Sequence, residues 1–481
     1  MARVIVIGGG ISGLSTARQI LDLSPDSEVI VLESSSRVGG CIQTETMDGF
    51  VMDGGASGFL NRDPSTLRIA RGLGLQDDVI SGCESVRRRY ILARGALRRF
   101  PDSPGTFATS DLLSAGARAR MLLEPMIPAG PAGVDETVQH FAVRRLGEEA
   151  AALLVDPVLT RIYAGDPTRL SVRATLPQLA ALEDEKQSLL MAFVRARGAS
   201  VKGKSASPSV LGSRRYVAFR GGIGQLVEAL ESSLGDRVVR GAPVLRVERS
   251  GTQWRVLTGG TDARDRVADV VVSAAPAPAA NAYAGHLHPA ISRACSSVPY
   301  APVVTVAIGH LEADVPHPLR GFGHLVPSRE QQSVLGVLWS TSIFPGERAP
   351  RGKVLFSAIL GGVRDPEICN RPDDELVWEA RKHLRLALGI QARPVAQRIF
   401  RHRVGIPQYE VGHLRRVARA EASLLDLPGF FLTGNAFRGI GVNACTADAQ
   451  RTAEAVFSYL HALSKLSLRD ASEDQRALLA S

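Results

Sequence analysis

The sequence predicts an α/β fold built around a Rossmann-like dinucleotide-binding domain, and three observations support this prediction. Residues 3–7, RVIVI, form a β-branched run that ends at Gly8, and the following ISGLSTARQIL has apolar residues at helical spacing. A second strand, EVIVL, ends directly before Glu33. Two later segments, 215–230 and 430–460, repeat the order strand, glycine-rich turn and helix. We therefore expect the domain to be assembled from separated pieces of the chain.

Three glycines occupy the positions of the motif G-x-G-x-x-G at the first turn. Gly8 permits the tight turn, Gly10 lets a pyrophosphate approach the backbone, and Gly13 lets the helix pack closely on the strand. The diphosphate then lies on the amide groups at the N-terminus of the helix. The first turn is therefore expected to bind the diphosphate of a dinucleotide.

The residues after the second strand indicate which dinucleotide is bound. Glu33, twenty residues after Gly13, can accept both hydroxyl groups of an adenosine ribose, and it disfavours the 2′-phosphate of NADP. Arg37, Gly39 and Gly40 then complete the pattern E-x-x-x-R-x-G-G. Small residues are needed where the backbone passes close to a flavin, so this extension favours FAD. The C-terminal glycine-rich turn is expected to bring a second helix N-terminus near the flavin pyrimidine. An NAD-binding fold with an unrelated glycine-rich loop is the alternative.

Basic residues gather in two segments of the chain, which has a net charge of +9. Residues 85–120 contain eight arginines and two aspartates, and residues 186–227 contain eight lysines and arginines and no acid. Such a zone is expected to meet an anionic membrane surface or an acidic substrate, with a merely solvated face as the alternative. Basic runs interleaved with base-stacking aromatics are missing, so we expect no nucleic-acid partner. No run of eighteen or more residues is both apolar and free of helix breakers, so we expect no spanning helix.

Five cysteines are scattered singly along the chain, without a C-x-x-C pair. This pattern argues against a zinc site or a disulfide framework and favours a reduced, cytoplasmic setting. His286 and His288 are the only close histidine pair in the sequence, and without neighbouring Cys or acidic ligands they are expected in a loop. We therefore predict no metal site. The N-terminal residues lack the features of a secretory signal, so the mature protein is expected to begin near Met1.

Seven segments carry a resemblance to a known family: VIGGGISGL (6–14), LESSSRVGG (32–40), DETVQHFAVRRLG (135–147), IYAGDPTRLSV (162–172), GFGHLVPS (321–328), IPQYEVGH (406–413) and GIGVNAC (439–445). On these residues the chain resembles the oxygen-dependent protoporphyrinogen oxidases of the amine oxidase superfamily. The first two segments are shared by many flavoenzymes, whereas IYAGDPTRLSV and GFGHLVPS are much more particular to this family.

The resemblance implies three domains and a tail. The implied fold combines a FAD-binding domain of the glutathione reductase and amine oxidase type with an α+β substrate-binding domain and a helical, basic, membrane-contacting domain. The implied boundaries are 1–85, 211–295 and 412–465 for the FAD-binding domain, 86–210 for the helical domain, 296–411 for the substrate-binding domain and 466–481 for a polar tail.

The resemblance also implies an activity. A member of this family oxidises protoporphyrinogen IX to protoporphyrin IX in haem biosynthesis, and three O2 molecules leave as three H2O2. Cys445 does not sit where the covalent flavin cysteine of monoamine oxidases lies, so FAD is expected to be noncovalent. The enzyme is expected in the cytoplasm, bound peripherally to the inner face of the membrane. A homodimer and hand-over of the product to ferrochelatase are further hypotheses about partners.

Site residues follow from the matching positions. Arg89 matches the propionate-binding arginine, Phe322 and Leu325 match the pair that clamps a pyrrole ring, and Ala164 and Gly165 bring backbone close to the tetrapyrrole. A guanidinium forms a bidentate, charge-assisted pair with a carboxylate, which Lys cannot copy. The flavin carries the chemistry, so no side chain is assigned as a nucleophile. The FAD contacts are Gly8, Gly9, Gly10, Ile11, Ser12, Gly13, Glu33, Ser34, Arg37, Gly40, Cys41, Gly55, Ala56, Ser57, Gly58, Val244, Asn435, Ile440, Gly441 and Val442.

Three alternatives to this function stay open. Related bacterial enzymes oxidise coproporphyrinogen III, whose four propionates suit the basic excess, although GFGHLVPS and GVLWSTSIFP resemble the protoporphyrinogen-type enzymes better. An amine oxidase or carotenoid desaturase is disfavoured, because an amine pocket needs caging aromatics and the aromatic content is only 5%. From a different class, a flavin-binding protein without catalysis could dock on membranes through the basic segments. Turnover with release of H2O2 separates that protein from an enzyme.

Overall fold

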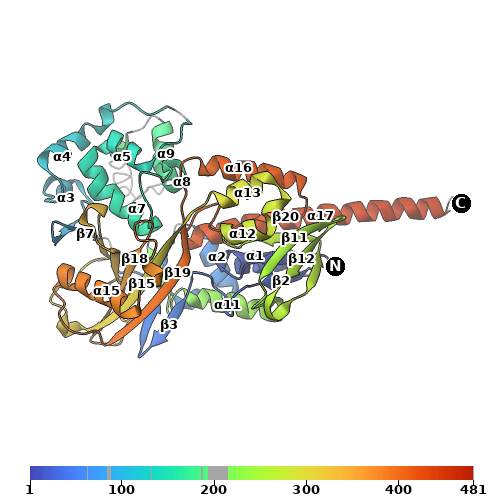
Figure 1. Ribbon diagram of the computed structural model, residues 1–481, viewed down its shortest axis with the longest axis horizontal. Helices are drawn as coiled ribbons and strands as arrows, with labels where there is room; N and C mark the ends of the chain where they lie inside the picture. Colours follow the sequence, from blue (N-terminus) through green and yellow to red (C-terminus); the bar gives the residue numbers. More distant parts are fainter. Residues whose placement is uncertain (62, 84–87, 132, 186–187, 193–214, 480–481) are drawn as a thin grey trace.

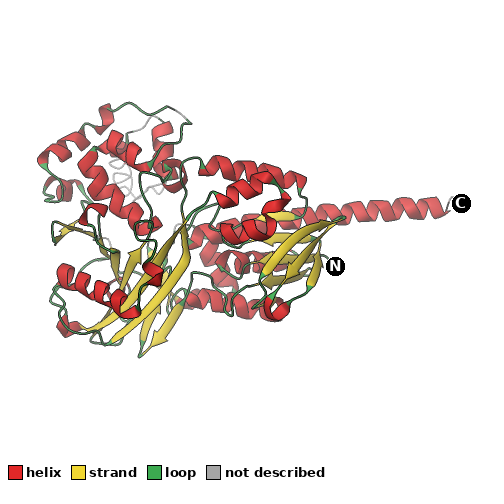
Figure 2. Ribbon diagram, in the orientation of Figure 1, coloured by secondary structure: helices red, strands yellow, loops and turns green. Residues whose placement is uncertain are grey.

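The computed structural model describes residues 1–481 apart from 62, 84–87, 132, 186–187, 193–214 and 480–481, with side chains described up to Lys465. Two bodies of β-structure lie side by side, a group of helices gathers above one of them, and the C-terminal helix projects away from the other (Figure 1). Strands form the middle of each body, and helices cover their faces (Figure 2). No helix in the described ranges is both long and apolar enough to cross a bilayer.

A five-stranded parallel sheet forms the middle of the first body. Its strands in spatial order are β10 (Val238–Val239), β2 (Glu28–Leu32), β1 (Arg3–Ile7), β14 (Val270–Ser273) and β20 (Phe430–Leu432). They come from three separated parts of the chain, so the predicted α/β fold with a discontinuous nucleotide-binding sheet is confirmed. Their β-branched side chains are buried on both faces, as in other parallel sheets covered by helices.

Helices cover both faces of this sheet and form two separate apolar cores. One face carries α1 (Ile11–Leu23), α11 (Gly224–Leu234) and α17 (Val442–Leu479), and the other carries α12 (Ala277–Ala284) and α13 (Pro289–Ser296). Around them lie α2 (Ser65–Gly72), α16 (His413–Ser423), the hairpin β3 (Thr44–Met47) and β4 (Phe50–Asp53), the sheet β5 (Phe59–Leu60), β9 (Tyr216–Phe219) and β6 (Val79–Ser81), and the sheet β11 (Val244–Ser250), β12 (Gln253–Thr258) and β13 (Asp265–Ala268).

A seven-stranded sheet forms the middle of the second body, and one face packs on α15 (Asp373–Leu388). The short helix α14 (Ser340–Ile343) directly follows the strand that ends at Trp339. Its strands in spatial order are β19 (Ala396–Pro407), β15 (Tyr300–Leu311), β18 (Lys353–Gly361), β17 (Val334–Trp339), β16 (Gly323–Leu325), β7 (Tyr90–Ala93) and β8 (Ala96–Arg99).

The last two strands differ from the sequence-based prediction, which places residues 86–210 in a helical domain. Residues 90–99 instead form a hairpin at the edge of the seven-stranded sheet. Arg94 and Gly95 make its turn with φ of 55° and 73°, the positive values that a two-residue hairpin turn requires. This hairpin carries the chain from the first body into the second and then into the helices.

The helical group follows this hairpin. It consists of α3 (Pro104–Ala108), α4 (Ala115–Leu122), α5 (Val138–Leu146), α6 (Glu148–Ala150), α7 (Asp156–Tyr163), α8 (Val172–Thr175) and α9 (Pro177–Asp184). Most of residues 186–227, the second basic segment, lies outside the described residues. The C-terminal helix α17 continues to Leu479, through the predicted polar tail 466–481.

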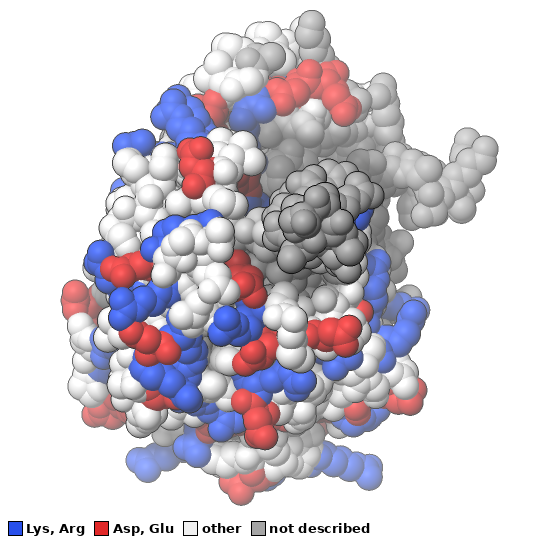
Figure 3. Space-filling view, turned by 90° about the vertical axis from the view of Figure 1, so that its right-hand side faces the viewer, with Lys and Arg blue, Asp and Glu red and all other residues white. Residues whose placement is uncertain are grey.

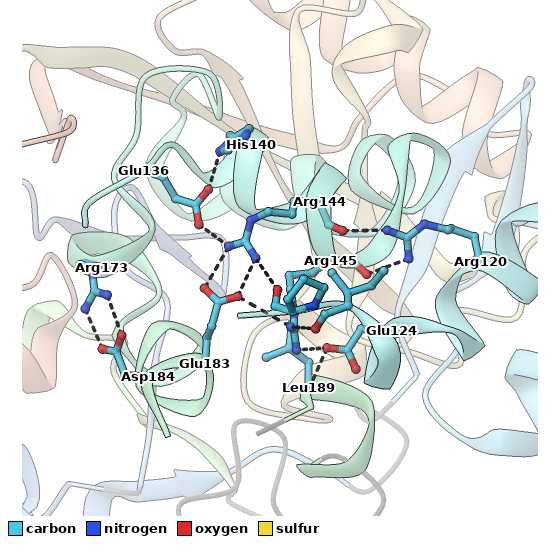
Figure 4. A network of polar contacts seen from close by, with 12 residues as sticks. Arg120, Glu124, Glu136, His140, Arg144, Arg145, Arg173, Glu183, Asp184 and Leu189 are labelled. Carbon is cyan, nitrogen blue, oxygen red and sulfur yellow. Dashed lines mark hydrogen bonds and ion pairs between the residues drawn. The ribbon is translucent and has the colours of Figure 1, made fainter. Parts of the chain in front are cut away.

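A network of ion pairs lies among these helices (Figure 4). Arg145 and Glu124 are both buried and pair directly. Next to them, Arg144 Nη1 lies 2.8 Å from Glu183 Oε1, and Arg120 donates to the carbonyl groups of Arg144 and Arg145. Other arginines of the first basic segment are also satisfied within it: Arg98 by Asp111, Arg99 by Asp102, and Arg118 by the carbonyl groups of Ala108 and Ser110. Two of these arginines, Arg98 and Arg99, are therefore paired with carboxylates, whereas Arg118 and Arg120 donate to carbonyl groups and keep their charge.

Candidate flavin and substrate site

Each glycine of the first turn has a separate structural reason. Gly8 has φ of +110°, which favours glycine. A Cβ on Gly13 would lie 1.9 Å from the Gly8 carbonyl oxygen, so only glycine lets α1 approach β1 this closely. Gly10 has an ordinary φ of −75°, and a Cβ there would meet no heavy atom within 4 Å. Because the protein itself does not require a glycine at position 10, the open space in front of Gly10 fits a diphosphate group.

The loop after β2 closes against this turn. The Gly39 N–H donates to the Gly9 carbonyl at 2.8 Å, and the atom nearest to a Cβ on Gly40 would be the Gly10 Cα at 3.6 Å. The buried Glu33 carboxylate accepts the Gly9 N–H at 2.7 Å. The two predicted cofactor motifs therefore form one surface, with the carboxylate at its edge.

Other predicted cofactor residues hold the same loops. The Ser35 N–H donates to Glu33 Oε1 at 2.8 Å, and the neighbouring Ser34 hydroxyl lies 3.3 Å from the same oxygen. The Arg37 guanidinium donates to the carbonyl groups of Val38 and Gly40 at 3.0 and 2.8 Å. The structure therefore gives Arg37 a role in loop shape, and direct contact with FAD stays a prediction for it.

A second helix N-terminus meets this surface, as the C-terminal motif predicts. Helix α17 begins at Val442. In its first turn the Cys445 N–H donates a hydrogen bond to the Gly441 carbonyl at 3.0 Å. A Cβ on Gly441 would meet no heavy atom within 4 Å, and one on Gly434 would lie 3.8 Å from Ser12 Oγ in α1. Two positive helix ends therefore lie near each other, which suits an anionic cofactor.

Cys445 is buried beside this turn, and burial raises the pKa of its thiol to about 11. It is thus held as an uncharged thiol, and noncovalent binding of the flavin stays a prediction. The carbonyl group of Asn435, another predicted contact, accepts the hydroxyl of Tyr409. Ile440 packs in the apolar cluster that also contains Tyr163 of α7.

The remaining predicted cofactor residues also gather here. A Cβ on Gly55 would lie 2.1 Å from the Cys41 carbonyl oxygen, so these two segments touch. Ser57, beside Ala56 and Gly58, hydrogen-bonds through Oγ with the Tyr216 hydroxyl at 3.1 Å. Val244 begins β11, two residues after Ala242, whose N–H donates to the Glu33 carbonyl at 2.8 Å. The glycine surfaces, the two helix ends and the carboxylate together fit FAD.

Arg89 and Phe322, both predicted to bind substrate, come together. The Arg89 Cζ lies 5.4 Å from the centroid of the Phe322 ring, and the Phe322 N–H donates to the Arg88 carbonyl at 2.8 Å. The Arg89 side chain is exposed, yet desolvation by the protein around it lowers its pKa against the attraction of Asp102. An exposed guanidinium beside an aromatic ring can bind a carboxylate group, and the substrate contact stays a prediction for Arg89.

Leu325 and His324 are neighbours in β16, and their side chains point to opposite faces of the sheet. Leu325 pairs with Ile91 and packs towards the apolar cluster of the helical group. His324 lies among the side chains facing α15, where its Nε2 is 2.8 Å from His383 Nε2. Both histidines are buried, and burial lowers the pKa of His383 to about 4. The histidine pair is therefore neutral at physiological pH and belongs to the core, and we assign it no proton transfer.

Ala164 and Gly165 follow α7 and are buried. Ala164 ends the helix in the left-handed conformation with φ of 48°, and its carbonyl accepts the Val363 N–H at 2.9 Å. A Cβ on Gly165 would lie 2.3 Å from Gln408 Oε1. Close packing therefore accounts for the missing side chain at Gly165, and contact with a substrate stays a prediction for both residues.

Two residues of this region were not predicted from the sequence. Tyr216 packs edge-on against Phe322, with ring centroids 5.1 Å apart, and its hydroxyl reaches Ser57. It therefore joins the predicted substrate clamp to the predicted cofactor segment. Arg161, on α7, acts on Tyr216 electrostatically. Its position three residues before Ala164, in TRIYAGDP, was the available signal, but one arginine on a helix is too common to single out.

Comparisons with known proteins agree with this geometry. A family model described as flavin containing amine oxidoreductase matches residues 11–457. The chain is 28% identical over 469 residues to the coproporphyrinogen III oxidase of Bacillus subtilis (strain 168), covering 95% of this chain and 98% of that protein. It is 30% identical over 489 residues to the chloroplastic protoporphyrinogen oxidase of Oryza sativa subsp. japonica, covering 95% and 89%.

Solved structures share the fold. A protein from Exiguobacterium sp. 255-15 superposes with a TM-score of 0.81 at 24% identity, over 95% of this chain and 98% of that one. Cyclohexylamine oxidase from Brevibacterium oxydans IH-35A superposes with a TM-score of 0.71 at 19% identity, over 96% and 99%.

Proposed function

Because the chain belongs to the flavin containing amine oxidoreductase family, we propose that this FAD-dependent enzyme oxidises a porphyrinogen to the corresponding porphyrin in haem biosynthesis. The relatives in rice and B. subtilis are named for two different porphyrinogens, so the comparisons support the substrate class rather than one substrate. The particular substrate must be argued from the site.

One observation carries the proposal: a guanidinium and an aromatic pair lie beside the cofactor loops. Arg89 lies over Phe322, and Tyr216 connects Phe322 to Ser57. A porphyrinogen is a large apolar macrocycle with carboxylate side chains, so it needs both an apolar wall and a cation. An amine substrate would approach as an ammonium ion, which arginine repels.

The side chains act by binding and orienting. Arg89 would pair with a propionate and so fix the rotation of the macrocycle, while Phe322 and Leu325 would hold one pyrrole ring. When bound, FAD would supply the redox chemistry, the acceptance of three hydride equivalents, which with the three protons released by the macrocycle would reduce three O2 to three H2O2. Correct placement of the macrocycle accounts for most of the protein's contribution, so no nucleophile is needed.

Protoporphyrinogen IX is the first candidate substrate, because GFGHLVPS and GVLWSTSIFP resemble the protoporphyrinogen-type enzymes. One observation favours coproporphyrinogen III as the second candidate. A further arginine, Arg161, lies against Gly336, which pairs with the predicted clamp residue Leu325, and coproporphyrinogen III carries four propionates for such cations. Product hand-over to ferrochelatase and a homodimer stay predictions.

Steady-state oxidation of both porphyrinogens tests the proposal. The purified FAD-loaded protein should produce a porphyrin, followed by its fluorescence, together with three H2O2 per porphyrin. A primary amine and a carotenoid precursor serve as control substrates. If neither porphyrinogen were oxidised, the enzymatic proposal would be wrong and a flavin-binding protein without catalysis would take its place.

We further propose that the helical group contacts the cytoplasmic face of an anionic membrane. Leu122, Leu123 and Met126 are exposed by 58, 52 and 78% at the end of α4. Apolar side chains close to arginines suit a lipid headgroup region. On the face at the C-terminal end, by contrast, basic and acidic residues are interspersed (Figure 3).

Co-sedimentation with vesicles at low salt tests this location. The protein should bind vesicles with anionic lipid more strongly than zwitterionic ones, and Leu123→Glu with Met126→Glu should weaken binding. Leu425→Glu is the control, because Leu425 is 85% exposed and lies after α16, in the body of the five-stranded sheet. Equal sedimentation with both vesicle types, or equal loss in the control, would contradict the proposed contact.

A further inference from the structure

Arg161 lies on α7, between the seven-stranded sheet and the helical group. Its Cδ is 3.2 Å from the position that a Cβ on Gly336 would take. Gly336 pairs with Leu325 on the adjacent strand, and α7 contacts both strands. The stem of this arginine therefore crosses the strand pair beside the predicted clamp residue Leu325.

Arg161 interacts electrostatically with Tyr216, a residue of the site already described. Burial lowers its pKa, and among the described residues Tyr216 is the one titratable neighbour that opposes this shift. Solvent nevertheless reaches the half-buried side chain. Tyr216 packs against Phe322 and hydrogen-bonds with Ser57, so its electrostatic interaction with Arg161 links this arginine to the clamp and the cofactor segment.

No carboxylate among the described residues makes a hydrogen bond or ion pair with Arg161. The carboxylate on its own helix, Asp156, is engaged by Arg364 at 3.2 Å and by the Ser328 N–H at 2.7 Å. A cation that is desolvated without a counter-ion is costly. An anionic ligand group at this position would offset that cost.

Arg89 and Arg161 interact with different rings of the aromatic pair Phe322 and Tyr216. Arg89 lies over Phe322, and Arg161 acts on Tyr216, whose ring centroid is 5.1 Å from that of Phe322. Arg89 directly precedes β7, whereas the stem of Arg161 extends from α7 against Gly336 in β17. The two cations therefore come from different elements and can meet carboxylates at two edges of one flat ligand.

We propose that Arg161 is a second carboxylate-binding residue of the substrate site, and that with Arg89 it selects porphyrinogens with carboxylates on more than one edge of the macrocycle. This inference rests on the proposed function. Coproporphyrinogen III has a propionate on every pyrrole ring, whereas protoporphyrinogen IX has propionates on two neighbouring rings only. The four-carboxylate substrate should therefore depend more strongly on Arg161.

The experiment compares the wild type with Arg161→Gln on both porphyrinogens, as FAD-loaded full-length proteins. We expect KM for coproporphyrinogen III to rise about tenfold or more with kcat nearly unchanged, and KM for protoporphyrinogen IX to change much less. Arg169→Gln is the control, because Arg169 pairs with Glu410 at 2.8 Å on the surface and is 63% exposed. It should leave both KM values unchanged.

A substrate change checks the same contact without relying on one variant. The tetramethyl ester of coproporphyrin III should bind the wild type more weakly than the free acid, measured by quenching of porphyrin fluorescence. Arg161→Gln should weaken binding of the acid and leave binding of the ester unchanged. If Arg161→Gln did not retain FAD, Arg161→Lys would carry the test, with a rise of a few-fold in KM for coproporphyrinogen III alone.

The possible failures are distinguishable. Oxidation of neither porphyrinogen by the wild type would overturn the proposed function. Normal wild-type turnover, with Arg161→Gln or Arg161→Lys raising both KM values equally or leaving both unchanged, would overturn only the role of Arg161. Loss of acid and ester binding to the same extent would also overturn it, because the effect would then not involve carboxylates.

Discussion

In the helical group, Arg145 is buried against Glu124, and Arg144 is bonded to Glu183. At the candidate site, Arg89 is exposed and Arg161 is half-buried, and neither hydrogen-bonds to a carboxylate among the described residues. The same residue type therefore serves two purposes in neighbouring parts of the molecule. Where the chain supplies the anion, arginine fixes the packing of helices, and where it does not, arginine is available to a ligand.

Two glycines of the first turn differ in a similar way, because the fold requires a glycine at position 13 but not at position 10. Gly10→Val should therefore affect cofactor binding alone, and this is the largest effect we expect. Valine fits the protein at this position, because a Cβ on Gly10 meets no heavy atom within 4 Å, but it fills the place of the diphosphate. The variant should fold and lose FAD completely, measured by the flavin absorbance of the purified protein. Gly72→Ala, which also projects into open space, should remain yellow. A yellow Gly10→Val protein would contradict the predicted diphosphate position.

Glu124→Gln removes the carboxylate that pairs with Arg145 in the helical group. The carboxylate is buried and also accepts the N–H groups of Leu189 and Leu190 at 3.0 and 3.1 Å. Taking the charge away from a buried ion pair should lower the free energy of unfolding by about 3–5 kcal/mol. Chemical denaturation of the FAD-loaded protein measures this loss. KM of the folded variant should stay at the wild-type value, and a selective rise in KM would argue against a purely structural role.

Arg89→Ala makes the opposite change, at the site. The free energy of unfolding should change little, because Arg89 is exposed, while binding should weaken by about 1.5–3 kcal/mol for one charged hydrogen-bonding group. Steady-state kinetics should record this loss as a rise in KM larger than the fall in kcat. An unchanged KM would remove Arg89 from the substrate site.

Low pH should lower the free energy of unfolding through the ion-paired helices, by less than the effect of Arg89→Ala on binding. Burial raises the pKa of Glu183, but the hydrogen bonds from Arg144 outweigh it and hold the pKa below the ordinary value. Glu183 therefore stabilises the fold above the pKa of about 4.3 of an unfolded glutamate, and this contribution is lost as pH falls through the lower folded-state pKa. Stability measured across this window should fall less steeply in Glu183→Gln. Identical slopes would contradict the pairing.

Arg99→Ala should have the smallest effect. Arg99 and Asp102 form an ion pair with both side chains partly exposed, by 45 and 32%. Such pairs contribute about 0–1 kcal/mol, so thermal unfolding should change by little. A loss comparable to that of Glu124→Gln would mean that exposure does not distinguish these pairs.

Local motifs could be predicted from the sequence because their spacing is short. The turns at Gly10 and Gly441 and the carboxylate of Glu33 depend on a few neighbouring residues, and the structure brings them together. The hairpin 90–99 was missed although its apolar run turns at Arg94 and Gly95, because the arginines around it suggested a basic helical surface.

Pairing between distant residues could not be predicted. Arg145 and Arg161 both lie on helices of the same group, and the sequence does not distinguish them. Their difference arises because Glu124 folds back onto one and no described carboxylate reaches the other. Only the tertiary structure shows that one arginine is paired and that the other has no carboxylate partner among the described residues.

The order of strands in the five-stranded sheet has a consequence for synthesis of the chain. The first strand, at residues 3–7, lies beside β14, and β14 pairs with β20, which begins at Phe430. Helix α17, which completes the cofactor surface, begins still later at Val442. A nascent chain therefore carries its diphosphate-binding turn for most of translation without the helix end that completes the site. FAD can be enclosed only after the chain beyond Val442 has emerged, so cofactor capture follows the pairing of β1 with β14 and of β14 with β20.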